Sequence, residues 1–305
     1  MNLLVTGSSG FVGRYFFRTI NSHSYLASTL SFTKFLNGDY DKSVFSNVSV
    51  IVHCAARVHV MSDESCDPLG AYREVNTTGT MTLAREAVEA GVKRFIFISS
   101  IKVNGESTII GAPFSSIDNR KPGDFYGQSK AEAEVQLLQL AKESGLEVVI
   151  IRPTLIYGPG VKANFASLLK LVSRGLPLPF GCIKDNKRSL VSVKNLVDLI
   201  VTCIDHPKAA NQIFLVSDDD DVSTALMVKH MSQSLGKSSR LLPVPLWCYR
   251  LVGKLTGKRD VIDRLLGSLQ VDITHTKNTL GWVPPQTLEQ GFKETAEAFL
   301  LNKNK

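Results

Sequence analysis

The sequence predicts an α/β fold with a doubly wound parallel sheet and a smaller C-terminal domain. Three observations predict it. Short apolar runs alternate with helical patterns through the first 150 residues, a glycine-rich loop follows the first run, and the pattern becomes irregular and richer in proline after Arg152. Strands separated by helices of this length form βαβ units, so we expect a parallel sheet covered on both faces.

The expected elements follow one another in order. The apolar run 3–6 predicts a strand and the amphipathic stretch 11–20 a helix, followed by strand 50–54, helix 71–90, strand 95–99, helix 130–144 and strand 148–152. The run 213–216 predicts one more strand that returns to the sheet. We therefore expect a first domain of residues 1–155 plus about 190–217, and a second domain of about 156–189 and 218–305.

The composition is that of a globular protein. Of 305 residues, 44% are hydrophobic and 21% are charged, which excludes a disordered or collagen-like chain. No apolar run approaches the ~18 residues of a membrane-spanning helix, and no secretory-signal pattern is present. Neither a disulfide framework nor a zinc site is predicted, because the five cysteines are scattered without a C-x-x-C pair: Cys54, Cys66, Cys182, Cys203 and Cys248. We expect a cytoplasmic protein.

The net charge of +7 is unevenly distributed. Residues 1–150 contain 14 Lys and Arg against 15 Asp and Glu, whereas residues 151–305 contain 21 against 13. The basic side chains form no stripe with aromatic residues, so nucleic acid is not an expected partner. A phosphate-bearing small substrate needs only a few of them, and the second domain is the expected place for it.

A glycine-rich loop lies between the first strand and the first helix. It reads Thr6-Gly7-Ser8-Ser9-Gly10-Phe11-Val12-Gly13, a G-x-x-G-x-x-G pattern. Glycines permit a tight turn and let N–H groups at the helix start approach a pyrophosphate. A plain strand-to-helix turn is the alternative, but the strand before and the helix after favour a Rossmann dinucleotide site.

The choice between NAD and NADP depends on the residues about 20 positions beyond the glycines, where a carboxylate usually binds the adenosine ribose. Here that window reads Ser31-Phe32-Thr33-Lys34, and the next acidic residue is Asp39. The missing carboxylate and the nearby lysine leave room for a 2′-phosphate, so both cofactors stay open, with NAD slightly favoured. Asp39 is expected either beside the adenine or in a surface turn.

A second motif is Tyr126-Gly127-Gln128-Ser129-Lys130, which puts Tyr126 and Lys130 on one face of a helix. An ammonium beside a phenol, with a cationic nicotinamide near, lowers the tyrosine pKa toward the working pH. Such a tyrosine can act as general acid and base in an alcohol–ketone interconversion. Ser100, 26 residues upstream at the end of an apolar strand, adds a hydroxyl at the sheet edge where such sites form.

In their order and spacing these motifs resemble the extended short-chain dehydrogenases/reductases, and within them the NAD-dependent nucleotide-sugar epimerase/dehydratase family. The resemblance covers nearly the whole chain. Its further landmarks are His53-Cys54-Ala55-Ala56, Val75-Asn76-Thr77-Thr78-Gly79-Thr80, Arg152-Pro153, Tyr157-Gly158-Pro159-Gly160 and Leu280-Gly281-Trp282.

The resemblance implies a role for each catalytic residue. Ser100 hydrogen-bonds the reacting sugar oxygen, Tyr126 carries the proton, and Lys130 binds the nicotinamide ribose while tuning Tyr126. The first domain holds the dinucleotide, and the residues implied at the cofactor are Gly7, Gly10, Phe11, Val12, Gly13, Asp39, Ala55, Ala56, Asn76, Tyr126, Lys130 and Pro153.

The second domain is then expected to hold a nucleoside diphosphate sugar. Matching positions suggest Asn164 and Arg188 at the phosphates, with Arg264 a further candidate. A guanidinium suits a diphosphate because it binds in a bidentate manner. A surface charge is the alternative for both arginines.

Departures from the family pattern narrow the chemistry. Dehydratases carry Asp-Glu after the catalytic Ser or Thr, where this chain has Ile101-Lys102, so dehydration is not expected. Asn104 replaces the tyrosine of V-Y-G and Leu155 the asparagine of R-P-x-N, both expected near the sugar. The strings S-S-I-K-V-N-G-E and P-G-V-K-x-N-F resemble a bacterial UDP-glucose 4-epimerase-like subgroup that includes 4-keto-reductases of surface-polysaccharide biosynthesis.

Several readings stay open. A UDP-hexose or UDP-N-acetylhexosamine 4-epimerase and a 4-keto-sugar reductase share every residue named above. A catalytically silent NAD(P)-binding sensor or scaffold is disfavoured because Ser100, Tyr126 and Lys130 are all retained. The stretch 246–258 alternates apolar and basic residues and is expected as a packed helix of the second domain, with contact to a membrane surface as the alternative. By resemblance, the helices in 72–90 and 126–144 pair two copies into a homodimer.

Overall fold

The computed structural model describes residues 1–20, 25–58 and 67–303, so Cys66 lies outside the described residues. Its main sheet has six strands in the order β2-β1-β3-β4-β5-β8, and every neighbouring pair is parallel. The strands are β1 (Asn2–Thr6), β2 (Leu26–Leu30), β3 (Val50–His53), β4 (Arg94–Ile98), β5 (Glu147–Pro153) and β8 (Gln212–Val216). The predicted doubly wound α/β fold is therefore confirmed, with β2 as a strand that the sequence pattern did not reveal.

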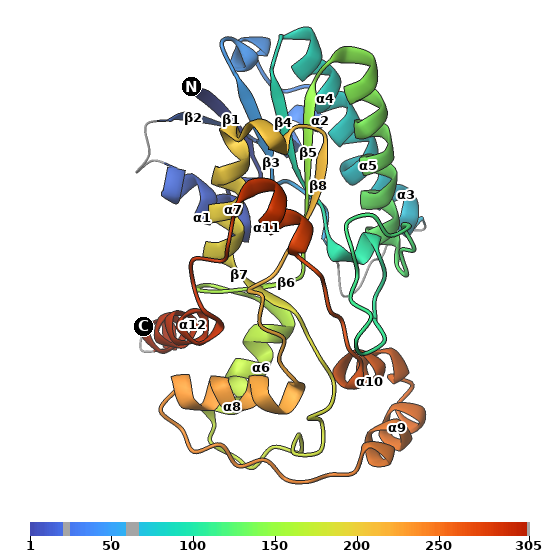
Figure 1. Cartoon of the computed structure of the whole chain (residues 1–305), viewed down its shortest axis with the longest axis vertical. Helices are drawn as coiled ribbons and strands as arrows, with labels where there is room; N and C mark the ends of the chain where they lie inside the picture. The colour runs from blue at the N-terminus through green and yellow to red at the C-terminus, as the bar shows by residue number, and fades with distance from the viewer. Residues whose placement is uncertain (21–24, 59–66, 304–305) are drawn as a thin grey trace.

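Helices cover both faces of this sheet (Figure 1). On one face, α1 (Phe11–Ile20) and α7 (Val193–Asp205) share a core with Leu3 and Val5 of β1. On the other face, α2 (Phe32–Leu36), α4 (Thr80–Glu89) and α5 (Phe125–Ser144) pack against Leu4 of the same strand. Alternate residues of one strand thus face opposite layers, as expected for a strand buried on both sides.

The predicted helix 71–90 is interrupted. It consists of α3 (Pro68–Arg73), a π-helical turn η2 (Glu74–Gly79) and α4. The predicted helix 130–144 begins earlier, at Phe125, because the Asp124 carboxylate accepts a hydrogen bond from the Gly127 N–H and caps the first turn. Three short 3-10 turns complete this half: η1 (Lys42–Phe45), η3 (Ile101–Val103) and η4 (Pro207–Ala209).

The second half of the chain lies mostly below the large sheet in Figure 1. It contains a two-stranded parallel sheet of β6 (Leu155–Tyr157) and β7 (Leu190–Ser192). Its helices are α6 (Ala163–Ser173), α8 (Thr224–Ser234), α9 (Leu246–Leu255), α10 (Arg259–Leu266) and α12 (Leu288–Lys303), and much of its core is aromatic, with Phe165, Phe180 and Phe292. Val271, Leu280 and Trp282, on and beside α11 (Thr274–Leu280), pack in the core of the large sheet instead. The division of the chain into two domains stays a prediction.

A buried polar cluster joins the two halves. The Tyr157 hydroxyl donates to Asp218 Oδ2 (2.7 Å) and lies 3.3 Å from the Leu288 carbonyl oxygen. Asp218 Oδ1 accepts from the Ser192 N–H and from Asn195 Nδ2. Burial raises the pKa of the Asp218 carboxyl. The Tyr157-Gly158-Pro159-Gly160 segment therefore begins at a fixed point between β6 and the return strand.

No helix in the described part of the chain is both long enough and apolar enough to span a bilayer.

Candidate active site

The glycine loop lies at the point where the sheet order reverses. β1 has β2 on one side and β3 on the other, so the loops after β1 and β3 frame a crevice at the carboxyl ends of the strands. Gly7 has a φ of +71°, and a Cβ there would lie 2.5 Å from the Ala55 backbone nitrogen. A Cβ on Gly13 would lie 2.2 Å from the Gly7 carbonyl oxygen. Both positions require glycine.

This crevice fits the pyrophosphate of a dinucleotide. The Gly10 N–H donates to the Gly7 carbonyl (2.9 Å), which closes the turn and leads directly into α1. Phe11 and Val12 begin that helix and are partly exposed, so their N–H groups belong to the unpaired first turn that attracts anions. Ala55 and Ala56 come from the loop after β3. The backbone of these residues would hold the phosphates when the cofactor is bound.

Asp39 follows α2 and the turn at Gly38. Its carboxylate is 3.7 Å from Lys34 Nζ, and both side chains are exposed, by 74% and 67%. Lys34 and Asp39, the two residues on which the choice between NAD and NADP depends, thus form an ion pair at the surface. A contact of Asp39 with the adenosine stays a prediction.

Ser100 and Tyr126 meet at the carboxyl end of β4. Ser100 follows this strand and caps η3, where its Oγ accepts from the Lys102 N–H (3.3 Å). Tyr126 lies in the first turn of α5, and the Ser100 side chain is close enough to its hydroxyl to lower the pKa of Tyr126. The predicted serine–tyrosine pair is therefore in contact. A sugar hydroxyl placed between them would reach both.

The charges around Tyr126 act in opposite directions. Burial and the Asp124 carboxylate raise the pKa of Tyr126, while the hydrogen bond to Ser100 lowers it. Lys102 Nζ forms an ion pair with Asp124 and lies 3.4 Å from Glu106 Oε1. Lys102 therefore partly neutralises the carboxylate that opposes ionisation of the phenol.

Lys130 is a buried cation one turn beyond Tyr126. Its side chain is 1% exposed, Nζ donates to the Ile98 carbonyl (2.9 Å) and sits 4.2 Å from the centre of the Phe97 ring. Burial lowers the pKa of Lys130 to about 7, although Cys54 and Glu134 counteract this shift. Among the described residues it has one hydrogen-bond acceptor, so two of its N–H groups are available for ribose hydroxyls.

Asn76 connects the cofactor side of the site to the catalytic helix. From the π-helical turn, its amide exchanges two hydrogen bonds with the backbone of Arg57, each 2.9 Å, and Nδ2 also donates to Ser129 Oγ (3.0 Å). Ser129 Oγ in turn donates to the Tyr126 carbonyl (2.8 Å). The predicted residue therefore anchors the loop after β3 and the turn that holds Tyr126. Whether it also touches the cofactor stays a prediction.

The three predicted phosphate ligands come from separate elements. Arg188 NH1 donates to the carbonyls of Arg264 (2.5 Å) and Gly267 (3.3 Å), and burial lowers its pKa. No carboxylate of the described residues forms an ion pair with Arg188, which leaves its charge available to an anion. Arg264 Nε is 4.0 Å from Glu106 Oε2, six residues beyond Ser100. Asn164 is exposed in the first turn of α6, and among the described residues no hydrogen bond joins it to either arginine.

Residues 3–217 match the NAD dependent epimerase/dehydratase family. A "UDP-glucose 4-epimerase" of Vibrio cholerae is 59% identical over 318 residues, covering 100% of this chain and 97% of that protein. The chain belongs to the NAD dependent epimerase/dehydratase family.

A more distant relative and two solved structures are also similar to this chain. An "N-acetyl-alpha-D-glucosaminyl-diphospho-ditrans,octacis-undecaprenol 4-epimerase" of Escherichia coli O157:H7 is 27% identical, covering 100% of this chain and 97% of that protein. The structure of RMD from Pseudomonas aeruginosa complexed with NADPH superposes with a TM-score of 0.78 at 21% identity, covering 98% of each chain. The UDP-glucose 4-epimerase of Thermotoga maritima with UDP-glucose gives 0.77 at 22%, covering 99% and 100%. At identities of 21% and 22%, these two structures show only that this chain has the same fold.

Sequence reasoning missed one group of this epimerase/dehydratase chain. Glu134 is fully buried and accepts from Ser99 Oγ (2.6 Å), Arg152 Nε (2.9 Å) and Arg120 Nε (2.9 Å). Arg152 NH1 also donates to Asn104 Oδ1 (2.9 Å). Asn104 is 2% exposed and belongs to this buried network, and its expected place near the sugar stays a prediction. A carboxylate four residues beyond Lys130 on one helix, with an arginine before Pro153, is the sequence signal that indicates the pair.

Proposed function

We propose that this protein is a UDP-hexose 4-epimerase that keeps NAD bound throughout its cycle. The observation that carries the proposal is the placement of Ser100 and Tyr126 together at the carboxyl end of β4, with the buried Lys130 one turn further along α5. Membership of an NAD-dependent family and the 59% identity to the Vibrio cholerae protein support the same reaction.

The catalytic residues divide the proton chemistry between them. Bound NAD would supply the reversible hydride transfer at C4 of the sugar. Tyr126 takes the C4 hydroxyl proton and gives it back, and Ser100 hydrogen-bonds the same oxygen. Lys130, when protonated, favours the phenolate and counters the burial that raises the tyrosine pKa. The Lys102 ion pair to Asp124 acts in the same direction.

The nucleotide is held by the second half of the chain. We place the diphosphate at Arg188, whose side chain is half-buried without a carboxylate partner among the described residues, with Arg264 and Asn164 as further ligands. Binding there would keep the sugar near Ser100, because Arg264 already reaches Glu106 of the loop that follows this serine.

Proton NMR of the purified protein with UDP-glucose, and separately with UDP-GlcNAc, tests the proposal without added cofactor. Signals of the C4 epimer are expected with at least one of the two, and Tyr126→Phe is expected to abolish them while retaining bound NAD. If folded wild-type protein with bound NAD forms neither epimer, the proposal is wrong.

One observation favours a second candidate, a 4-keto-sugar reductase. The segment after β2 carries Lys34 and no acidic residue before Asp39, which suits the 2′-phosphate of an exchangeable NADPH. Stoichiometric oxidation of NADPH by a 4-keto UDP-sugar, together with silence in the NMR assay, would identify this activity.

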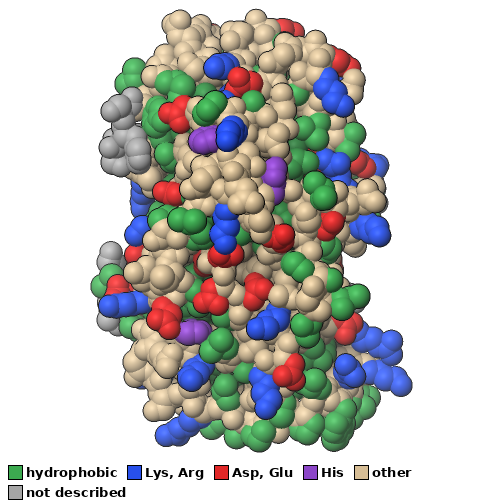
Figure 2. Space-filling model, in the orientation of Figure 1, with side chains coloured by type: hydrophobic (Ala, Val, Ile, Leu, Met, Phe, Trp, Pro, Cys, Tyr) green, Lys and Arg blue, Asp and Glu red, His purple; other side chains and the backbone are tan. Residues whose placement is uncertain are grey.

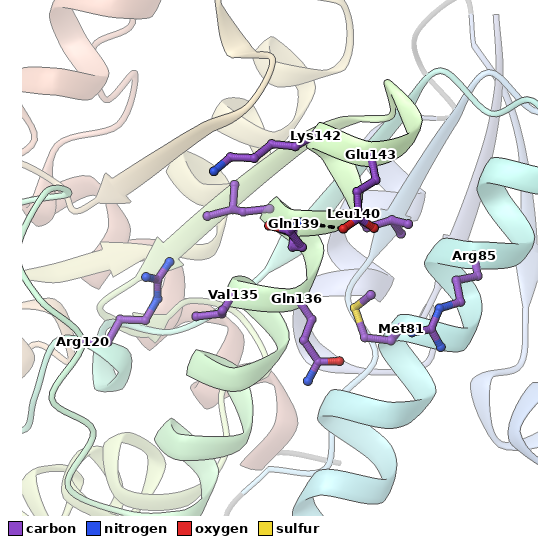
Figure 3. Close-up of a pocket in the computed structure, with 10 residues that line it drawn as sticks. Met81, Arg85, Arg120, Val135, Gln136, Gln139, Leu140, Lys142 and Glu143 are labelled. Carbon is purple, nitrogen blue, oxygen red and sulfur yellow. Dashed lines mark hydrogen bonds between the residues drawn. The ribbon is translucent and has the colours of Figure 1, made fainter.

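We also propose a homodimer that pairs through α4 and α5. A pocket of about 490 Å³ opens between these helices and contains none of the catalytic residues (Figure 3). Met81 and Arg85 line it from α4, and Val135, which is 53% exposed, lines it from α5. Light scattering coupled to size exclusion is expected to give twice the chain mass, and Val135→Glu the mass of one chain.

A cytoplasmic location is proposed as well. The four cysteines within the described ranges are free thiols, with Cys203 buried in the core, and reduced thiols are typical of that compartment. Fractionation of cells that produce the protein would check this location.

A further inference from the structure

Helices α9 and α10 lie at the end of the molecule opposite the sheet (Figure 1). Between residues 242 and 261, seven large hydrophobic side chains are 36% to 76% exposed: Leu242, Leu246, Trp247, Leu251, Val252, Leu255 and Val261. In the space-filling view, hydrophobic side chains gather along the lower edge, with Lys and Arg side chains at its right end (Figure 2). A contiguous apolar surface of this kind marks an interaction site.

The apolar face of α9 points outward. Trp247, Leu251 and Leu255 follow one another at intervals of four residues and form a ridge, exposed by 64%, 47% and 76%. The inner face consists of Tyr249 and Gly253, where a Cβ on the glycine would lie 2.8 Å from Ile262 Cγ1 of α10. The helix therefore packs through Tyr249 and Gly253 and presents Trp247 and its leucines to the exterior.

Positive charge borders this ridge. Arg250 and Lys254 lie beside it on α9, and together with Arg259 they line a pocket of about 240 Å³ between the two helices. Residues 246–264 contain five Lys and Arg against two Asp. Among the side chains that the structure describes, Asp263 is the one acidic residue that lines the pocket.

We infer that α9 and α10 dock this protein on an anionic phospholipid bilayer. The Trp247–Leu251–Leu255 ridge enters the interface between headgroups and acyl chains, and the cationic pocket receives a lipid phosphate. Tryptophan is the side chain most suited to this depth. A second copy of the chain fits less well, because a symmetric contact through this face would set the same cations against one another.

The docking surface adjoins the proposed phosphate site. Arg188 donates to the carbonyls of Arg264 and Gly267, at and just beyond the end of α10. Bilayer contact would thus position the substrate end of the protein at the membrane surface. This inference concerns location and does not depend on which sugar is turned over.

Vesicle binding of the holoenzyme tests the inference. Co-sedimentation is expected with vesicles of phosphatidylglycerol and phosphatidylcholine and is expected to fall at least tenfold with phosphatidylcholine alone. Tryptophan emission is expected to shift to the blue on binding. The chain has two tryptophans, and Trp282 is 5% exposed with Nε1 bonded to Asp198 (2.7 Å), so the shift reports Trp247.

Two pairs of variants separate the contributions. Leu251→Ser with Leu255→Ser is expected to reduce vesicle binding at least tenfold, whereas Leu26→Ser with Leu301→Ser, which removes two equally exposed leucines elsewhere, leaves it unchanged. Arg250→Glu with Lys254→Glu is expected to abolish the preference for anionic lipid, in contrast to the control Lys208→Glu with Lys229→Glu. UDP-glucose turnover stays the same in the serine variants.

The inference is overturned if wild-type protein fails to bind the anionic vesicles, or if the ridge variant binds as well as its control. It is also overturned if the Leu251→Ser, Leu255→Ser pair abolishes self-association of the protein in solution, since the face would then join two copies. Loss of epimerase activity with vesicle binding intact would count against the proposed function alone.

Discussion

Replacing Lys130 with methionine is expected to abolish turnover and to change the pH dependence of stability. Lys130 is 1% exposed, and burial lowers its pKa to about 7 from an ordinary 10.5. Methionine has a similar length and no charge, so the variant removes the buried ammonium without leaving a large cavity. It also loses the hydrogen bond to the Ile98 carbonyl, which lowers stability at every pH.

The magnitude follows from the pKa shift. Since the folded pKa lies below the unfolded one, the unfolded chain binds more protons between about pH 7 and 10.5, and the penalty from Lys130 is lost as the pH rises through this window. Each pH unit inside the window corresponds to about 1.4 kcal/mol. Relative to the variant, the wild-type protein is therefore expected to gain roughly 3 kcal/mol between about pH 7 and 9.5.

Urea unfolding of the cofactor-free proteins at several pH values measures this difference. Lys142→Met is the matched control, because Lys142 is an exposed lysine near the end of the same helix. Its stability difference from wild type is expected to stay constant with pH. A constant difference for Lys130→Met as well would refute the reasoning, since it would mean that Lys130 keeps its ordinary pKa in the folded state.

Three further variants test other parts of the site. Ser100→Ala is expected to lower kcat about 10²- to 10³-fold through the lost hydrogen bond to the reacting oxygen, with NAD affinity unchanged by calorimetry; a loss under tenfold would exclude direct contact. Glu134→Leu is expected to destabilise the protein by about 3–5 kcal/mol, because Arg152 is left buried without its carboxylate. A thermal melt measures this, and an unchanged Tm would show that the pair contributes nothing. Arg188→Ala is expected to raise the KM for the UDP-sugar at least tenfold with little change in kcat, because a bidentate phosphate contact acts on binding. An equal fall in kcat would instead place Arg188 at the reacting atoms.

The large sheet could be predicted from the sequence because its strands are buried on both faces. Runs such as Phe95–Ile98 and Val148–Ile151 are continuously apolar, which no surface strand requires. β2 was not predicted because it lacks such a run: most of its residues are exposed, and its sequence is Leu-Ala-Ser-Thr-Leu. The π-helical turn around Asn76 escaped prediction because it depends on contacts with Arg57 and Ser129, which are distant in sequence.

The site could be predicted where one motif fixes it locally. Tyr126 and Lys130 share a helix face, and Ser100 ends the neighbouring strand, so spacing alone brings them together. The motif that predicts Asn104 near the sugar did not reveal its hydrogen bond to Arg152 of β5, whose partner Glu134 lies on α5, because these residues are distant in sequence. The outward ridge of α9 could not be predicted, because periodicity identifies an apolar face without showing which way it points.

The cluster around Tyr157 has a consequence for how the protein is made. Its hydroxyl meets Asp218 and Leu288, which follow it by 61 and 131 residues, and Gly291 packs so closely that a Cβ there would lie 2.4 Å from the same oxygen. On the ribosome, β1 to β5 can therefore pair while the chain is still growing, but the aromatic core behind Tyr157 has to wait for α12. A chain truncated before residue 288 would therefore have a formed nucleotide-binding sheet attached to a second half whose hydrophobic core is exposed and prone to aggregation.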